Sequence, residues 1–348
     1  MTDPLSPHNV PGPDPLPRPA PPPSALSRLT GGMGGAGNLQ LLLICIVVFA
    51  AMTAMNPRFL NPYNFQSMAS FLPELGILAL AMMIAMLTGG IDLSVVGLAN
   101  LAAVTAGLFF ARQGGKDAGA AIALAGVMVA LGVGVAGGML NGLLISRLRI
   151  TPILATLGTG YVFTGLALVL TGGPAIVGFP AAWNAIGNAH IGPVPVPFLI
   201  FVAVCAGVWA LLSRSAFGLQ LMLIGTNPRA AIFAGIRRGR MLMYSYALTG
   251  AMAALAGIIL SARTNAAKSD YGASYLLQAV LIAVLGGTNP AGGRGSVMGV
   301  VLAVASLVML SSGFQMMRVS NFMIDFIWGA FLIAVLTINV LLNRRGEG

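Results

Sequence analysis

Few side chains in this sequence could do chemistry, and they stand mostly at the edges of long apolar runs. Only 8 Asp and Glu accompany 18 Lys and Arg among the 348 residues. The two histidines (His8, His190) and two cysteines (Cys45, Cys205) have no metal-binding or catalytic spacing, and no G-x-x-x-x-G-K-[ST] phosphate loop occurs. We therefore expect no catalytic residue, no metal site and no cofactor bound by this chain.

Three acidic residues stand where apolar spans are expected to begin. Glu74 follows Pro73, Asp92 lies in "TGGIDLS", and Asp325 comes one turn after Asn321. A carboxylate at a helix start caps backbone amides or favourably meets the helix dipole. We interpret Glu74 and Asp325 in this way, and for Asp92 capping and gating both stay open. With no ionisable residue placed inside a span, proton coupling is not expected, whereas sodium coupling through backbone carbonyls stays open.

Two polar, glycine-rich stretches interrupt the apolar sequence, "TGGIDLS" at 88–94 and "GGTNPAGGRGS" at 286–296. Irregular backbone at membrane depth is tolerated only inside protein or along a water-filled path. We predict breaks that flex during transport and line the path; the alternative is that the glycines only allow tight packing and Arg294 anchors a helix end. The candidate residues for the path or gate are Gly89, Gly90, Asp92, Ser94, Asn100, Gly286, Gly287, Thr288, Asn289, Gly292, Gly293 and Arg294.

The elements that must position these residues are membrane-spanning helices. Hydrophobic residues make up 57% of the chain, charged residues only 7%, and the mean hydropathy is +0.91. Because a bilayer core of roughly 30 Å needs about 20 apolar residues, the sequence predicts an all-α polytopic membrane protein with about ten spans. The eighth is short and is expected to be broken or re-entrant. The predicted spans are 39–55, 69–88, 93–111, 118–146, 151–171, 196–213, 241–262, 276–287, 296–313 and 322–342.

The ends of the chain and its basic connectors define the expected topology. Residues 1–38 are rich in proline and glycine and are expected to form a disordered cytoplasmic tail. Basic residues gather in 147–149, in 214–240 and at 344–345. Placing all three on the cytoplasmic side gives ten spans with both termini inside. Since these residues lie at span ends rather than on one folded face, the expected surroundings are membrane lipid and not nucleic acid.

The connector 214–240 is the candidate docking segment for another protein. It contains Asn227-Pro228, a helix-start signal, followed by a short helical stretch that ends near Gly235. Because the chain lacks a nucleotide site, ATP-driven transport would need a separate subunit, and this connector could receive it. The alternative is a basic loop with no partner.

Four blocks together resemble the inner-membrane permease subunits of ribose-, xylose-, arabinose- and galactoside-type sugar ABC importers. They are "LTGGIDLSVVGLANLAAVTAG" at 87–107, "NGLLISRLRITPILATLGT" at 141–159, "GTNPRAAIFAGI" at 225–236 and "AVLGGTNPAGGRGSVMGVVLA" at 283–303. The resemblance covers about 39–345 and implies a type II-like ABC importer architecture that moves a monosaccharide, a pentose or hexose, by alternating access across the bacterial inner membrane.

The resemblance also implies partners. These are an ABC ATPase subunit that binds ATP and Mg, a periplasmic sugar-binding protein, and a second permease, either a copy of this chain or a similar one. Family members often carry an acidic residue in the coupling block, where this chain has Pro228-Arg229. The residues matching the element that couples to the ATPase are Gly225, Thr226, Asn227, Pro228, Arg229, Ala230, Ala231, Gly235 and Ile236.

Two other functions are compatible with a polytopic chain. One is an ion-coupled secondary carrier for an uncharged solute, and the other is a membrane scaffold that transports nothing. The polar interruptions argue against a scaffold. Retention of an ATPase subunit on purification would distinguish the importer from the carrier.

Overall fold

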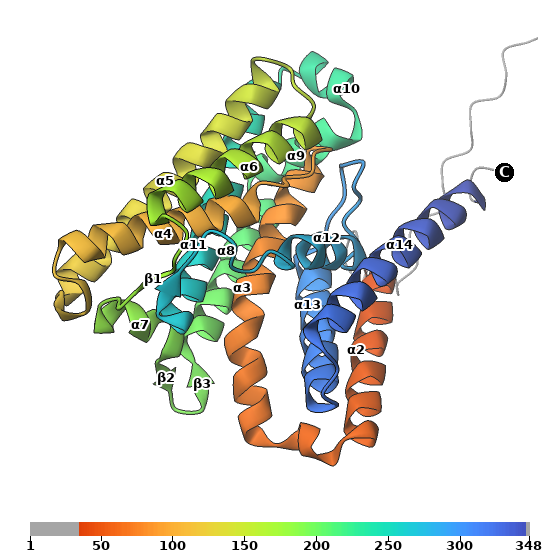
Figure 1. Ribbon diagram of the computed structural model, residues 1–348. Helices are drawn as coiled ribbons and strands as arrows, with labels where there is room; N and C mark the ends of the chain where they lie inside the picture. Colours follow the sequence, from red (N-terminus) through yellow and green to blue (C-terminus); the bar gives the residue numbers. More distant parts are fainter. Residues whose placement is uncertain (1–34, 346–348) are drawn as a thin grey trace, which may run out of the picture.

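The computed structural model describes residues 35–345, so the expected tail over 1–38 lies outside the described residues except at its end, where helix α2 begins at Gly35. Within 35–345, eight helices are long and apolar enough to cross a membrane. The helical bundle confirms the predicted all-α polytopic fold (Figure 1). These eight are α2 (Gly35–Met55), α3 (Pro62–Leu87), α4 (Val95–Arg112), α5 (Ala120–Ser146), α6 (Pro152–Thr171), α8 (Val196–Arg214), α11 (Arg238–Thr264) and α13 (Val297–Met316).

The remaining two predicted spans are also helical. The short eighth span corresponds to α12 (Tyr275–Leu285), which has only 11 residues, and the tenth to α14 (Asn321–Arg345). The connector 214–240 folds into α9 (Ala216–Thr226) and α10 (Pro228–Phe233). Single 3-10 turns, η1 (Pro57–Leu60) and η2 (Gly115–Asp117), follow α2 and α4.

Asn-Pro pairs start three of the helices. The side chains of Asn56, Asn61 and Asn227 each accept a hydrogen bond from the backbone amide two residues later. Proline fits the next position because its missing N–H has no partner at a helix start and its φ is already helical. This signal explains why α3 begins at Pro62 rather than at 69, the predicted start of the second span.

A small layer outside the long helices lies at one end of the bundle. It contains α7 (Ala181–Asn188) and four two-residue strands. β1 (Ile176–Val177) pairs antiparallel with β4 (Ala266–Ala267), placing Ile176 opposite Ala267, and β2 (His190–Ile191) pairs with β3 (Val194–Pro195). Helix α10 lies at the other end of the bundle (Figure 1). We call these ends the strand end and the coupling end.

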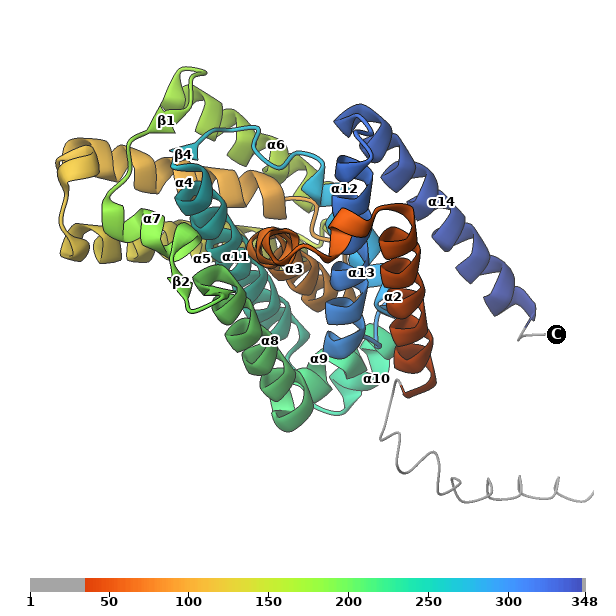
Figure 2. The ribbon, with the colours of Figure 1, turned by 90° about the horizontal axis from the view of Figure 1, so that it is seen from below.

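Helix α3 forms the centre of the bundle. It packs against α8, α11, α12 and α13, and Figure 2 shows it nearly end-on among them. Its second half, from Glu74 to Leu87, is buried throughout. Helix α14 crosses the outside and contacts α12 and α13.

Helices α5 and α11 pack with their backbones close together. A Cβ at Gly134, Gly138 or Gly142 on α5 would collide with backbone atoms of Gly250, Tyr246 or Met243 on α11. Small residues at steps of four, as in this run, allow two helix backbones to approach this closely.

Candidate functional site

Three segments that are far apart in the sequence meet at the coupling end. Gly225, near the end of α9, lies against the carbonyl oxygen of Leu87 and the backbone of Gly292 and Gly293. The Gly293 amide donates a hydrogen bond of 3.0 Å to the Leu87 carbonyl. A Cβ on Gly89 would lie 3.2 Å from the Ala291 carbonyl oxygen. We call Leu87, Gly89, Gly225, Gly292 and Gly293 the glycine junction.

The 286–296 loop reaches this junction as an ordered turn. The Asn289 side chain accepts a hydrogen bond of 3.0 Å from the Ala291 amide, and the Asn289 amide donates one of 3.0 Å to the Arg294 carbonyl. Gly292 and Gly293 have φ of +102° and +82°, a conformation that suits glycine. The structure therefore uses these glycines both for close packing and for the shape of the turn.

The candidate coupling segment, residues 225–236, contains the short helix that the sequence predicts, α10. Asn227 caps α10 by accepting hydrogen bonds from the amides of Arg229 (3.1 Å) and Ala230 (3.0 Å). Ala231 is buried, whereas Phe233 is 92% exposed. Beyond α10, Gly235 adopts a φ of +80°. The helix thus presents an exposed aromatic side chain outward and is continuous with the glycine junction through Gly225 and Thr226.

Asp92 is the centre of a buried polar network at the start of α4. Its Oδ1 accepts hydrogen bonds from the backbone amide (3.0 Å) and hydroxyl (2.6 Å) of Ser94, and its Oδ2 accepts one from the Thr249 hydroxyl (2.9 Å). Asn141 donates to the Ser94 hydroxyl at 2.7 Å and accepts from the Thr159 hydroxyl at 2.6 Å. Asp92 and Ser94 therefore join the start of α4 to helices α5, α6 and α11.

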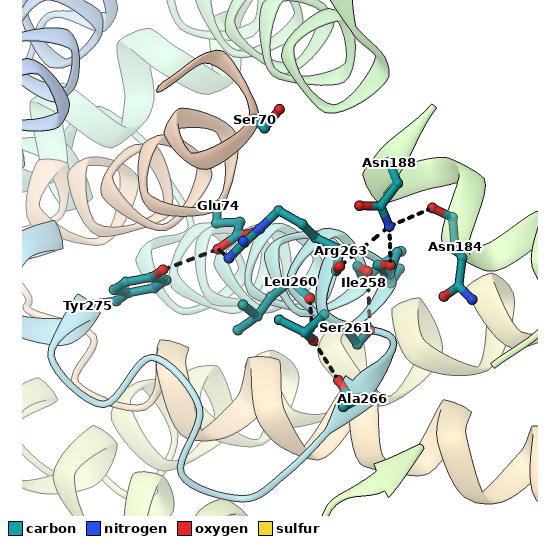
Figure 3. A network of polar contacts seen from close by, with 12 residues as sticks. Ser70, Glu74, Asn184, Asn188, Ile258, Leu260, Ser261, Arg263, Ala266 and Tyr275 are labelled. Atoms are coloured by element: carbon teal, nitrogen blue, oxygen red, sulfur yellow. Dashed lines mark hydrogen bonds and ion pairs between the residues drawn. The ribbon is translucent and has the colours of Figure 1, made fainter. Parts of the chain in front are cut away.

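Glu74 does not stand at a helix start, so the capping and dipole interpretation of this residue is wrong. Helix α3 continues through Pro73, and Glu74 is buried in its middle. There it forms a two-contact ion pair with Arg263, with 3.2 Å between Nη2 and Oε2, and accepts a 3.2 Å hydrogen bond from the Tyr275 hydroxyl (Figure 3). Proline is tolerated inside a membrane helix where neighbouring groups satisfy the freed carbonyl.

This position also removes the premise that no ionisable residue lies inside a span. Glu74 is an acidic side chain in the middle of a membrane helix, the kind of group that proton-coupled carriers use. It is matched here by the Arg263 guanidinium, which also lies 4.2 Å from the centre of the Phe71 ring. The absence of an ionisable residue inside a span therefore cannot be used against proton coupling. Glu74 differs from an unpaired proton-binding carboxylate in being paired with Arg263.

The end of α11 connects this pair to the strand end. Asn188 of α7 donates a 2.8 Å hydrogen bond to the carbonyl of Ala262, next to Arg263 (Figure 3). Asn265 ends α11 with a φ of +51° and accepts a 2.9 Å hydrogen bond from the Phe179 amide. Helix α7 is thereby fixed to the element that carries Arg263.

Asp325, the third candidate acidic residue, is exposed on α14, four residues after the helix begins. Its side chain makes no hydrogen bond or ion pair with the described residues. It faces a cavity of about 620 Å³ that is bounded by the beginnings of α3, α12 and α14 and the end of α13. The lining residues are Asn64, Ser67, Met68, Phe71, Leu75, Ser274, Tyr275, Gln278, Val308, Ser311, Ser312, Gln315, Met316, Ile324 and Asp325.

The candidate path residues lie elsewhere. None lines this cavity. Gly89, Gly292 and Gly293 lie at the glycine junction, Asp92 and Ser94 belong to the Asp92 network, and Gly286 packs against the backbone of Val300 on α13. Asn100 donates two 2.9 Å hydrogen bonds to the carbonyls of Ser269 and Tyr271, beside a much smaller cavity that Glu74 and Tyr275 also line. Arg294 is exposed and follows Gly293 of the glycine junction at the coupling end.

The sequence contains a signal for the cavity, although the cavity is not among the sequence predictions. Asn64, Ser67, Phe71 and Leu75 recur at steps of three and four on α3, and Ser311, Ser312 and Gln315 interrupt the apolar face of α13 at similar spacing. Such steps put polar side chains on one face of each helix. They do not show that the two faces meet.

Comparisons with known proteins agree with this architecture. Residues 64–336 match the protein family described as "Branched-chain amino acid transport system / permease component". The chain belongs to this permease family. The "Autoinducer 2 import system permease protein LsrD" of Escherichia coli K12 and that of Shigella flexneri are each 35% identical over 303 residues, which cover 85% of this chain and 90% of the relative. The protein of the same name from Escherichia coli O157:H7 is 34% identical over the same length. No solved structure matches the chain.

Family membership confirms the resemblance to importer permeases that the four sequence blocks predict. The family description mentions amino acids, whereas the relatives carry the name of another solute, so the solute of this permease has to be argued from its own residues.

A pair of substitutions distinguishes the two interpretations of Asp92 in this permease. The asparagine of Asp92→Asn can still accept hydrogen bonds from Ser94 and can donate one to the Thr249 hydroxyl, so we expect near-normal stability and uptake. Asp92→Ala leaves buried donors without partners, which costs roughly 1–3 kcal/mol each, and should lower the thermal unfolding midpoint clearly. An Asp92→Asn protein that is made and inserted normally but does not import would instead show that the charge is needed for gating.

Proposed function

We propose that this permease is the membrane-spanning subunit of a binding-protein-dependent ABC importer for a sugar-like solute, a monosaccharide of pentose or hexose size. The family membership and the relatives, permeases of an autoinducer 2 import system, support this proposal. ATP and Mg would be bound by a separate ATPase, and a periplasmic binding protein would deliver the solute. A second permease, identical or similar, would complete the membrane unit in the bacterial inner membrane.

The observation that carries the proposal is the contact of the coupling segment with the two glycine-rich loops. Gly225 lies three residues before α10 begins at Pro228, so a movement of α10 would reach it directly. It touches the backbone of Leu87 at the end of α3 and of Gly292 and Gly293 in the 286–296 region. Gly292 in turn lies against the Gly89 amide of the 88–94 region. An element moved by an ATPase is thus joined, without intervening side chains, to the end of α3 and to the loop between α12 and α13. Packed elements of this kind move together, which is what alternating access requires.

This function places the coupling end in the cytoplasm. The basic residues of the 214–240 connector lie there, as do the beginning of α2, where Asn38 accepts a 3.2 Å hydrogen bond from Ser296, and the end of α14 (Figure 1). Both termini of the described chain then face the cytoplasm, in keeping with the positive-inside rule. The strand end, with α7, would face the binding protein.

Phe233 tests the docking role of α10. Truncating an aromatic anchor at an interface costs about 2 kcal/mol, roughly thirtyfold in affinity, so Phe233→Ala should sharply reduce the amount of ATPase that co-purifies with the tagged permease. Phe322→Ala is the matched control, because Phe322 is also highly exposed (88%) but begins α14 at the opposite end. The readouts are the recovered ATPase and vanadate-sensitive ATP hydrolysis.

The same preparation discriminates the importer from the alternative, an ion-coupled secondary carrier. Purified permease that imports solute in proteoliposomes with an ion gradient and no second protein would contradict the proposal. Equal ATPase recovery from the Phe233→Ala and wild-type proteins would show that the ATPase does not dock on α10.

A further inference from the structure

The cavity between α3, α12, α13 and α14 contains an unusual number of polar side chains for a chain that is 57% hydrophobic. Inside a membrane protein, polar side chains face the bundle interior or a water-filled space and mark substrate pathways. We infer that this cavity is the solute-binding site of the import path and that it accepts an uncharged, polyhydroxylated molecule. This inference rests on the proposed function and adds the location and chemistry of the site.

The lining has free hydrogen-bonding capacity. The Ser312 hydroxyl donates a hydrogen bond of 2.6 Å to the side-chain oxygen of Asn64. The Asn64 side-chain amide donates one of 2.9 Å to the Phe59 carbonyl. The other serine and glutamine side chains in the lining form no hydrogen bond with the residues that the structure describes: Ser67, Ser274, Ser311, Gln278 and Gln315. Hydroxyl and amide groups both donate and accept, so they complement the hydroxyls of a sugar in either role.

The size and the aromatic residues suit the same ligand class. A volume of about 620 Å³ lies within the range of roughly 300–1,000 Å³ that small-molecule sites occupy. Phe71 and Tyr275 add aromatic rings to the lining, and the Tyr275 hydroxyl already donates to Glu74. Toward the cavity, that hydroxyl can therefore act as an acceptor.

The charges in the lining argue against an amino acid as the solute. Asp325 is the acidic residue of the lining, and no Lys, Arg or His is found among the lining residues in the described part of the chain. The nearby Arg263 is held by Glu74 and covered by the Phe71 ring. A solute carboxylate would find no cation here, whereas neutral hydroxyl groups need none.

The position of the cavity connects it to the coupling machinery. Helix α12 begins at Tyr275 in the cavity and ends at Leu285, just before the loop that forms the glycine junction. Its 11 residues span about 16 Å. Helix α3 likewise begins beside the cavity and ends at Leu87 of the junction. A change at the junction would therefore reach the bound solute through two continuous helices.

Cysteine labelling tests the site in the complete transport complex. In a background with Cys45→Ser and Cys205→Ser, Ser311→Cys should react with a membrane-impermeant maleimide. Ser306→Cys should not react, because Ser306 is on the same helix but buried and bonded to the Leu302 carbonyl. The probes are D-ribose, D-xylose, L-arabinose and D-galactose, with L-leucine as the amino acid. The sugar that the complex imports should slow labelling of Ser311→Cys at least fivefold, and L-leucine should not.

Uptake by a second variant pair checks the hydrogen bonding. Gln278→Leu should reduce import of that sugar about tenfold when compared at equal amounts of inserted complex, and Gln66→Leu, the same change on α3 outside the lining, should have little effect. A complex that imports a sugar while Ser311→Cys stays unprotected and Gln278→Leu imports normally would overturn the inference and leave the proposed function intact. Import of L-leucine with protection by L-leucine would overturn the assigned ligand class.

Discussion

Replacing Gly225 with valine should abolish coupled transport. A Cβ at this position would overlap the Leu87 carbonyl oxygen and the Gly293 amide nitrogen, so two backbones must separate to make room. Backbone atoms held in a turn cannot yield as a flexible side chain does, and overpacking of this kind costs about 1–3 kcal/mol or more. We expect at least a tenfold loss of uptake with Gly225→Val and an intermediate loss with Gly225→Ala. ATP-driven uptake in proteoliposomes measures both.

The control for this prediction is another glycine in a helix. Gly207 on α8 has open space around its Cβ position, so Gly207→Val should insert and transport like the wild-type protein. Basal ATP hydrolysis by the Gly225→Val complex should persist, because the substitution breaks transmission and leaves the nucleotide site of the partner untouched. Normal uptake by Gly225→Val would mean that the junction is open during transport and does not transmit movement.

The parts of this molecule that the sequence predicts well are those governed by local rules. Long apolar runs set the spans, and the shortness of α12 follows from the break at Gly286. The Asn227-Pro228 start of α10 depends on one side chain bonding amides two and three residues away. None of these features requires knowledge of the rest of the fold.

The meeting of the glycine-rich segments could not be derived in the same way. Each segment, 88–94, 225–227 and 286–296, reads as a break or turn by itself. Their contact depends on how α3, α9 and α12 are arranged, and the spacing of residues within one segment contains no information on that arrangement. The cavity is a stronger case, since it requires the relative rotation of four helices.

Glu74 shows how a local rule can mislead. The Pro73-Glu74 pair has the pattern of a helix start, yet Asn61-Pro62 supplies the actual start and α3 runs through the second proline. The partner that stabilises the carboxylate, Arg263, lies 189 residues further along the chain. Pairing at that separation is a property of the packed bundle, and it changes the interpretation from a helix cap to an ion pair between a buried carboxylate and a partly buried guanidinium.

The Glu74–Arg263 pair should show a larger stability coupling than the other ion pair among the described residues, Lys268–Asp270. Removing one partner of a buried pair leaves an uncompensated charge and costs about 3–5 kcal/mol, whereas replacing both with apolar groups of similar size is often neutral. We expect Glu74→Met and Arg263→Met each to lower the thermal unfolding midpoint strongly and the double variant to recover most of the loss. Thermal unfolding of the purified permease in detergent, monitored by intrinsic fluorescence, gives the midpoints of the two single variants and of the double variant.

The exposed Lys268–Asp270 pair provides the comparison, because its partners are 3.0 Å apart at the surface. Pairs of this kind contribute about 0–1 kcal/mol, so Asp270→Asn should leave the midpoint nearly unchanged. A double variant whose loss of stability equals the sum of the two single losses would show that Glu74 and Arg263 act through separate neighbours, such as Tyr275 and Phe71. Recovery of stability without recovery of uptake would show instead that the charges serve the transport cycle, since apolar replacements fill the same space but cannot hold Tyr275 at the edge of the cavity.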